Sequence, residues 1–118
     1  MKKIFVFGSN TEGRHGAGAA LHAMKNHGAK YGCPAGLQGN SYAIVTKNLA
    51  KGLKSIPLNE IEAKIKDFIL MAKTQPQLQF YVSAIGCGLA GYKPEEIGPM
   101  FKGCPSNVEL CKEFQPFV

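Results

Sequence analysis

Long hydrophobic runs are absent from this 118-residue sequence. No apolar stretch approaches the roughly 18 to 20 residues that a membrane-spanning helix requires. The apolar run near the N-terminus ends at Gly8 after four residues, and no small-residue cleavage site follows a longer apolar core. We therefore expect no membrane association and no signal peptide, and we place the protein in the cytoplasm.

Cysteine pairs with metal-site or redox spacing are also missing. Cys33, Cys87, Cys104 and Cys111 form neither a CxxC motif nor a Cys/His pattern. This predicts free thiols in a reducing compartment and no bound metal. The sequence lacks a GKS or GKT phosphate-loop motif and a dinucleotide-binding fingerprint, so we predict no cofactor.

Acidic residues are few relative to basic ones. Eight acidic against fourteen basic residues give a formal charge of +6, which favours anionic partners. No basic cluster interleaved with aromatic residues marks a nucleic-acid-binding face. A phosphorylated small molecule is therefore supported at least as well as a nucleic acid.

Strands and helices alternate along the predicted chain. A buried strand over residues 4–7, a strand over 41–48 and another over 77–86 alternate with helices near 15–29 and 59–76, and an irregular loop is expected at 31–39. The second helix has the most regular apolar stripe: Ile61, Ile65, Phe68, Ile69 and Ala72. A short helix from Pro94 and a weak strand near 107–111 complete the pattern.

This alternation predicts the fold class. We expect a single domain, residues 1–118, with a three-layer α/β/α sandwich and a largely parallel sheet. If strands 4–7 and 77–86 are neighbours with their helices on opposite faces, their C-terminal loops border a ligand-binding crevice.

Both of these loops are rich in glycine. "GRHGAGAA" and "GCGLAG" each precede a helix, and glycine lets backbone N–H groups converge on a phosphate at a helix N-terminus. Glycine-rich turns can also serve only to connect elements, and that alternative stays open for each loop.

At these motifs the chain resembles macrodomains. "VFGSNTEGRHGAGAALHA" is similar to their first signature and "FYVSAIGCGLAGYKPEEI" to their second. Together with the strand "GNSYAIVTK", these motifs make the chain resemble small macrodomain-like proteins of bacteriophages. It departs from the family in three places: the strands that bear the adenine-binding Asp have no counterpart, "GSN" keeps one of two usual Asn residues, and Lys93 displaces the usual Pro to Pro94.

The resemblance implies a site for ADP-ribose or a related nucleotide derivative. It would place Asn10 on the distal ribose, the second loop around the diphosphate, and Tyr92 over the ribose. The ligand-binding residues that we predict are Gly8, Ser9, Asn10, Arg14, Gly16, Ala17, Gly18, Ile85, Gly86, Cys87, Gly88, Leu89, Ala90, Gly91 and Tyr92. In a phage, which would place the protein in the host cytoplasm, such binding would sequester a nucleotide signal of host immunity.

Two alternative functions remain at this point. One is a hydrolase of ADP-ribose derivatives, with Asn10, Glu12 and His15 as catalytic candidates. For His15 we weigh a ligand contact against a solvent-exposed loop position, and for Asn10 we weigh ribose binding against a turn-stabilising role. A nucleophilic Cys87 is disfavoured against a small loop residue, while Thr46 and Lys47 could reach the same edge. The other alternative is a basic module that binds nucleic acid or protein.

Overall fold

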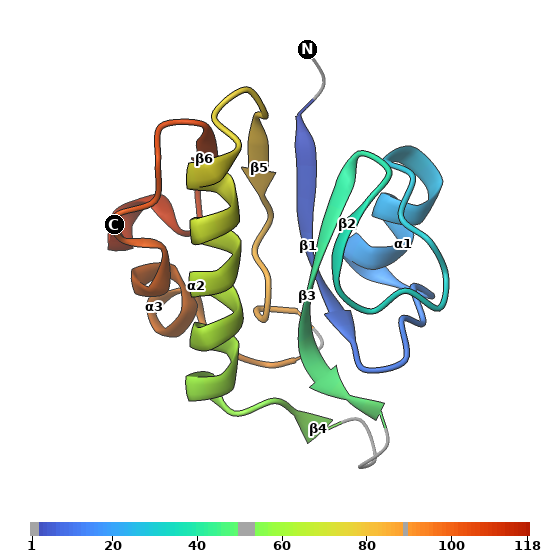
Figure 1. Ribbon diagram of the computed structural model, residues 1–118. Helices are drawn as coiled ribbons and strands as arrows, with labels where there is room; N and C mark the ends of the chain where they lie inside the picture. The colour runs from blue at the N-terminus through green and yellow to red at the C-terminus, as the bar shows by residue number, and fades with distance from the viewer. Residues whose placement is uncertain (1–2, 50–53, 89) are drawn as a thin grey trace.

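A mixed six-stranded sheet forms the centre of the protein, as the computed structural model shows for residues 3–49, 54–88 and 90–118 (Figure 1). The strand order is β2-β3-β1-β5-β6, and β4 pairs with β3. The strands are β1 (Ile4–Asn10), β2 (Gly36–Gln38), β3 (Ser41–Asn48), β4 (Lys54–Ser55), β5 (Phe80–Val82) and β6 (Val108–Leu110).

Four of these strands are parallel, as predicted. β1 pairs in parallel with β3 on one side and β5 on the other, and β5 pairs in parallel with β6. The short strands β2 and β4 run antiparallel to β3 and make the sheet mixed. β2 lies inside the segment 31–39 that we expected to be an irregular loop, so that expectation is wrong there.

The helices follow the predicted order. They are α1 (Gly18–Asn26), α2 (Leu58–Thr74) and α3 (Pro94–Ile97), followed by the 3₁₀ helices η2 (Gly98–Phe101) and η3 (Gln115–Phe117). The buried residues of α2 are the five of the predicted apolar stripe, which confirms its inward face. The helix ends at Thr74, where the buried side chain of Asn107 donates to the carbonyl of Ala72 at 3.0 Å.

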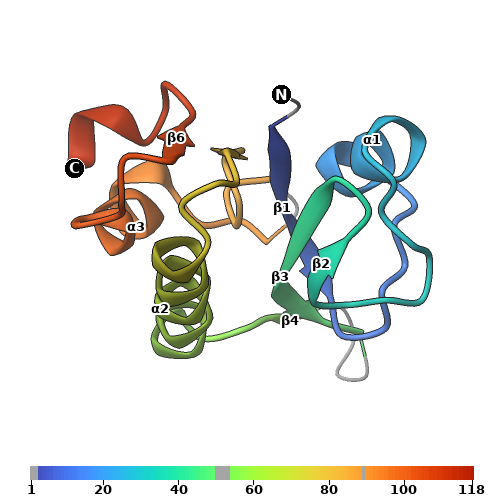
Figure 2. The ribbon, with the colours of Figure 1, turned by 45° about the horizontal axis from the view of Figure 1, so that its top comes forward.

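Two hydrophobic cores lie on opposite faces of the sheet. Val6 packs in the larger core with α2, whereas its neighbour Phe7 packs in the smaller core with Ala20 and Ala23 of α1. Figures 1 and 2 show α1 and α2 on opposite sides of the strands. The continuous apolar run of β1 is therefore buried on both faces, and the predicted three-layer α/β sandwich is confirmed.

The lengths of two strands differ from the sequence prediction. β1 continues beyond Phe7 to Asn10, while β5 is limited to Phe80–Val82 within the predicted strand 77–86.

Within the described residues, none of the helices has the length and apolar character needed to cross a membrane.

Candidate functional site

A cavity of about 670 Å³ opens where the parallel strands β1 and β5 end. From this edge the chain leaves β1 toward β3 and leaves β5 toward β6, on opposite sides, so the cavity lies at a topological switch point of the sheet. The described residues that line it are Gly8, Ser9, Asn10, Arg14, Gly16, Ala17, Gly18, Ala19, Ala20, Thr46, Lys47, Leu49, Ser83, Ala84, Ile85, Gly86, Gly88 and Ala90. Both glycine-rich loops border one cavity, as their positions predicted.

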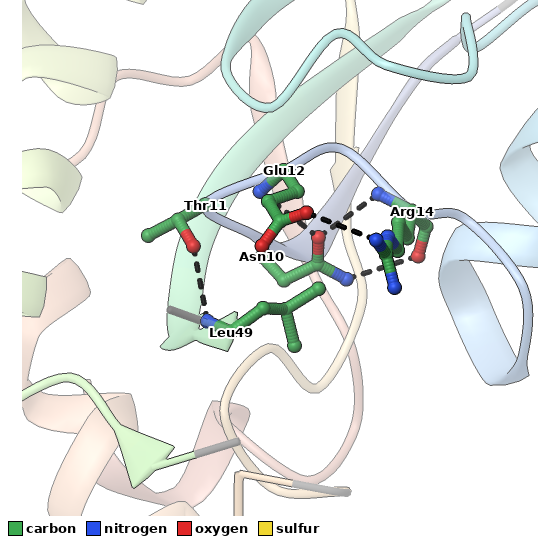
Figure 3. Close-up of polar contacts among 5 residues, drawn as sticks. All are labelled: Asn10, Thr11, Glu12, Arg14 and Leu49. Carbon is green, nitrogen blue, oxygen red and sulfur yellow. Dashed lines mark hydrogen bonds and ion pairs between the residues drawn. The ribbon is translucent and has the colours of Figure 1, made fainter. Parts of the chain in front are cut away.

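The first loop is held in place by the side chain of Asn10. Its Nδ2 donates to the carbonyl of Arg14 at 2.9 Å, and its Oδ1 accepts the backbone N–H groups of Arg14 at 2.9 Å and Glu12 at 3.3 Å (Figure 3). These bonds close residues 10–14 into a turn, which is the structural role weighed against ribose binding. Asn10 lines the cavity, and one N–H of its amide makes none of these bonds.

Arg14 and Glu12 form an ion pair at the tip of this loop. The guanidinium Nη2 lies 3.2 Å from Glu12 Oε1, and the two side chains are 63% and 44% exposed. Such an exposed pair contributes little to stability, so the guanidinium can exchange partners readily. Arg14 lines the cavity, but Glu12 is not among the described lining residues, so the geometry does not favour Glu12 as a base acting on a ligand there.

His15 is placed differently from both expectations for it. The residue is fully buried, and its ring packs edge-on against Phe7 with the ring centroids 5.2 Å apart. Its Nε2 lies 3.2 Å from the carbonyl of Cys33 and 3.3 Å from Gln38 Oε1, so it must carry the proton and donate. Neither a solvent-exposed loop position nor a contact with the cavity is correct, and the catalytic prediction for His15 loses its basis.

The second loop turns sharply at Gly86. This residue has a φ of 74°, and an added Cβ would lie 3.3 Å from Ile97 Cδ1, so a side chain would be both strained and crowded. The carbonyl of Gly86 accepts the N–H of Tyr92 at 2.8 Å and closes the loop. Gly88 instead has open space around the position of a Cβ, so it leaves its backbone accessible from the cavity.

Cys87 points away from the cavity toward the larger core. It packs against that core and is not among the described lining residues. Burial, with smaller contributions from nearby negative groups, raises the pKa of the Cys87 thiol to about 11. A neutral, inward-facing thiol fits the alternative of a small loop residue, and it contradicts both a nucleophile and a phosphate-contacting side chain.

Tyr92 is likewise not among the described residues that line the cavity. Its hydroxyl donates to the carbonyl of Ile56 at 2.7 Å, and its ring packs against the larger core. Core packing and this hydrogen bond hold the side chain outside the described lining, so the structure does not favour the prediction that Tyr92 covers a ribose. Gly91 lies outside the described lining as well, and Leu89 falls outside the described residues.

Several lining residues lie outside the two glycine-rich loops. Thr46 and Lys47, considered only weakly from the sequence, line the cavity from β3, and Leu49 follows that strand. Sequence reasoning did not select Leu49, Ser83 or Ala84. The signal that could have found them is topological, because residues at the C-terminal ends of adjacent parallel strands share one edge.

The described residues include no candidate metal site. Across residues 3–49, 54–88 and 90–118, no three His, Cys, Asp or Glu side chains are grouped so that they could hold a metal ion.

Comparison with known proteins identifies the fold but not the family. No family model and no curated protein matches the sequence. A solved structure described as a protein of unknown function from Bacteroides thetaiotaomicron is similar, with a TM-score of 0.61 and 19% identity over 93% of this chain and 88% of that one. At this identity the similarity shows a shared α/β fold alone, so the macrodomain resemblance stays a prediction.

Proposed function

We propose that the protein binds ADP-ribose or a related nucleotide derivative in the cavity between its two glycine-rich loops. The observation that carries this proposal is the convergence of both loops on one cavity at the switch point of the sheet. Open α/β sheets bind ligands at this place. The resemblance of the two loops to macrodomain signatures supplies the class of ligand.

The charges around the cavity support an anionic ligand. The charged side chains among the described lining residues are those of Arg14 and Lys47, both cationic. Helix α1 begins at the cavity with Gly18, has no side-chain cap and has no acidic residue in its first turn. Its first N–H groups and its dipole therefore attract negative charge, as a phosphate would provide.

Binding is favoured over hydrolysis by the placement of the catalytic candidates. Of Asn10, Glu12 and His15, only Asn10 lines the cavity, and its amide is engaged in the turn of the first loop. A protein that holds such a nucleotide without converting it lowers its free concentration. In a bacteriophage this would sequester an immune signal, which is the biological role that we propose.

Isothermal titration with ADP-ribose at low salt tests the proposal. Gly88→Glu should abolish binding, because it projects a carboxylate into the cavity where we propose an anion. Position 88 has no positive φ and no atom within 4 Å of an added Cβ, so the variant should fold normally. Gln79→Glu is the matched control, because it makes the same charge change at the exposed start of β5, at the opposite end of the sheet.

The proposal fails if wild-type protein does not bind ADP-ribose, or if Gly88→Glu binds as well as Gln79→Glu does. Recovery of unchanged ADP-ribose after long incubation separates binding from hydrolysis. Conversion by the wild-type protein would instead support the hydrolase alternative.

A further inference from the structure

Backbone groups of the two loops add hydrogen-bond donors to those that the Arg14 and Lys47 side chains bring to the cavity. Within the described part of the chain, the N–H groups of Gly86 and Gly88 donate to no other group. On the opposite wall, the first N–H groups of α1 lack a side-chain cap. Both walls therefore present donors, which a phosphate with its several acceptor oxygens can satisfy.

Two hydroxyl groups of the cavity lining, those of Ser83 and Thr46, are placed to act as hydrogen-bond acceptors. Ser83 Oγ donates to the carbonyl of Val6 at 2.6 Å, and Thr46 Oγ1 donates to the carbonyl of Ser9 at 3.2 Å. A hydroxyl that already donates its proton offers only lone pairs to a ligand. The ligand groups that match these positions are donors, and the hydroxyl groups of a sugar are such donors.

The described lining lacks two kinds of side chain that commonly hold a nucleobase. It contains no aromatic side chain on which a base could stack and no carboxylate that could accept from an exocyclic amino group. The residues that are not described, 1–2, 50–53 and 89, include neither an aromatic nor an acidic residue in the sequence. Leu49 and Ile85 can contact the face of a ring, but apolar contact does not read the polar edge that makes bases different.

From this distribution we infer that the cavity recognises the phosphorylated sugar of its ligand and does not read the base. The inference rests on the proposed function and narrows it, because it assigns affinity to the phosphate and the sugar hydroxyls. The ligand class is a phosphorylated ribose, free or within a sugar nucleotide. The base occupies a position where its exchange changes little.

Parallel titrations with a set of related ligands test the inference. ADP-ribose, its hypoxanthine, guanine and uracil counterparts, and ribose 5-phosphate are compared in one buffer. We expect the four nucleotides to have dissociation constants within about fivefold of one another, because a lost apolar contact changes affinity modestly. Ribose 5-phosphate should bind measurably to the same site and be displaced by ADP-ribose.

A variant at the sugar-binding wall gives a second readout. Ser83→Ala removes a proposed acceptor and should weaken ribose 5-phosphate binding by about threefold to tenfold, with inorganic phosphate affected less. Thr74→Ala on α2 is the control, because its hydroxyl donates to the carbonyl of Met71 on the exposed surface away from the cavity.

Three outcomes would contradict the inference. A preference for adenine above about thirtyfold would show that the base is read, while leaving nucleotide binding intact. Equal loss of phosphate and ribose 5-phosphate binding in Ser83→Ala would show that the hydroxyl does not contact the sugar. Failure of every ligand to bind would overturn the proposed function itself.

Discussion

The two loops that border the cavity are held by different forces. The first loop is stabilised by polar contacts, among them the amide of Asn10 bonded to the backbone of residues 12 and 14. The second is stabilised from behind, by the packing of Tyr92 and by Ser55, whose hydroxyl donates to the carbonyl of Ala90. Substitutions in the first loop should therefore act through hydrogen bonds and close backbone approach, and those in the second through contacts with the core.

Gly13→Ala should have the largest effect on stability and would break the first loop. Gly13 has a φ of 66°, and an added Cβ would lie 2.5 Å from the backbone nitrogen of Cys33. Positive φ and overpacking against backbone together should lower the free energy of unfolding by about 2 to 4 kcal/mol. Urea denaturation measures this effect.

Gly16→Ala is the matched control for this prediction. Gly16 lies in the same loop, its φ is not positive, and nothing lies within 4 Å of an added Cβ. Its free energy of unfolding should change by less than about 0.5 kcal/mol. Equal effects of the two substitutions would contradict the close approach at Gly13.

Tyr92→Phe should have an intermediate effect and would weaken the second loop. The substitution removes the hydroxyl that donates to Ile56 and keeps the buried ring. The free energy of unfolding should fall by about 1 kcal/mol, the typical contribution of one such bond. Ligand affinity should change little, because the hydroxyl bonds Ile56 and Tyr92 is not among the described lining residues. A large loss of affinity without a loss of stability would instead show that Tyr92 contacts the ligand.

The smallest effect that we predict concerns the reactivity of Cys87 in the second loop. Its thiol should be alkylated slowly at neutral pH. With a pKa of about 11, about one thiol in a thousand is ionised at pH 8. The alkylation rate, followed by mass spectrometry of the Cys87 peptide, should therefore rise about tenfold per pH unit up to about pH 11. Rapid alkylation at pH 7 would show that the thiol faces the cavity as a thiolate.

The same pKa has a consequence for stability. Because the thiol has a higher pKa in the folded protein than in the unfolded chain, ionisation favours unfolding. This contribution to stability is complete below about pH 8.5 and is lost as the pH rises toward 11. Cys87→Ser should reduce the fall of the unfolding free energy across this pH range, which denaturation at several pH values measures.

Regular periodicity explains which parts of the fold could be predicted from the sequence. The buried stripe of α2 and the bounds of the strand Ser41–Asn48 were predicted correctly. In long segments the pattern of apolar residues indicates both the type of element and its buried face. The strand β2 was missed, since its three residues, Gly36–Gln38, contain turn-forming glycine and owe their conformation to pairing with β3. Short strands depend on partners that local sequence does not specify.

At the site, the sequence predicted the positions of the loops better than the directions of their side chains. The positions of both loops followed from the alternation of strands and helices. The side chains of His15, Cys87 and Tyr92 were misplaced, because each turns toward the interior from a loop with no periodicity to indicate its direction. Glycine spacing predicts where backbone is accessible, but not where an intervening side chain points.

The buried imidazole of His15 makes the first loop depend on a distant segment. Its bonds to Cys33 and Gln38, together with the N–H of Gly32 donating to the carbonyl of Gly13, set this wall of the cavity on the segment that ends in β2. The segment therefore supports the first loop from outside the cavity. A residue inserted between positions 32 and 38 would shift the cavity wall without changing any lining residue. Length variation there is a route by which ligand preference can change while both glycine motifs stay intact.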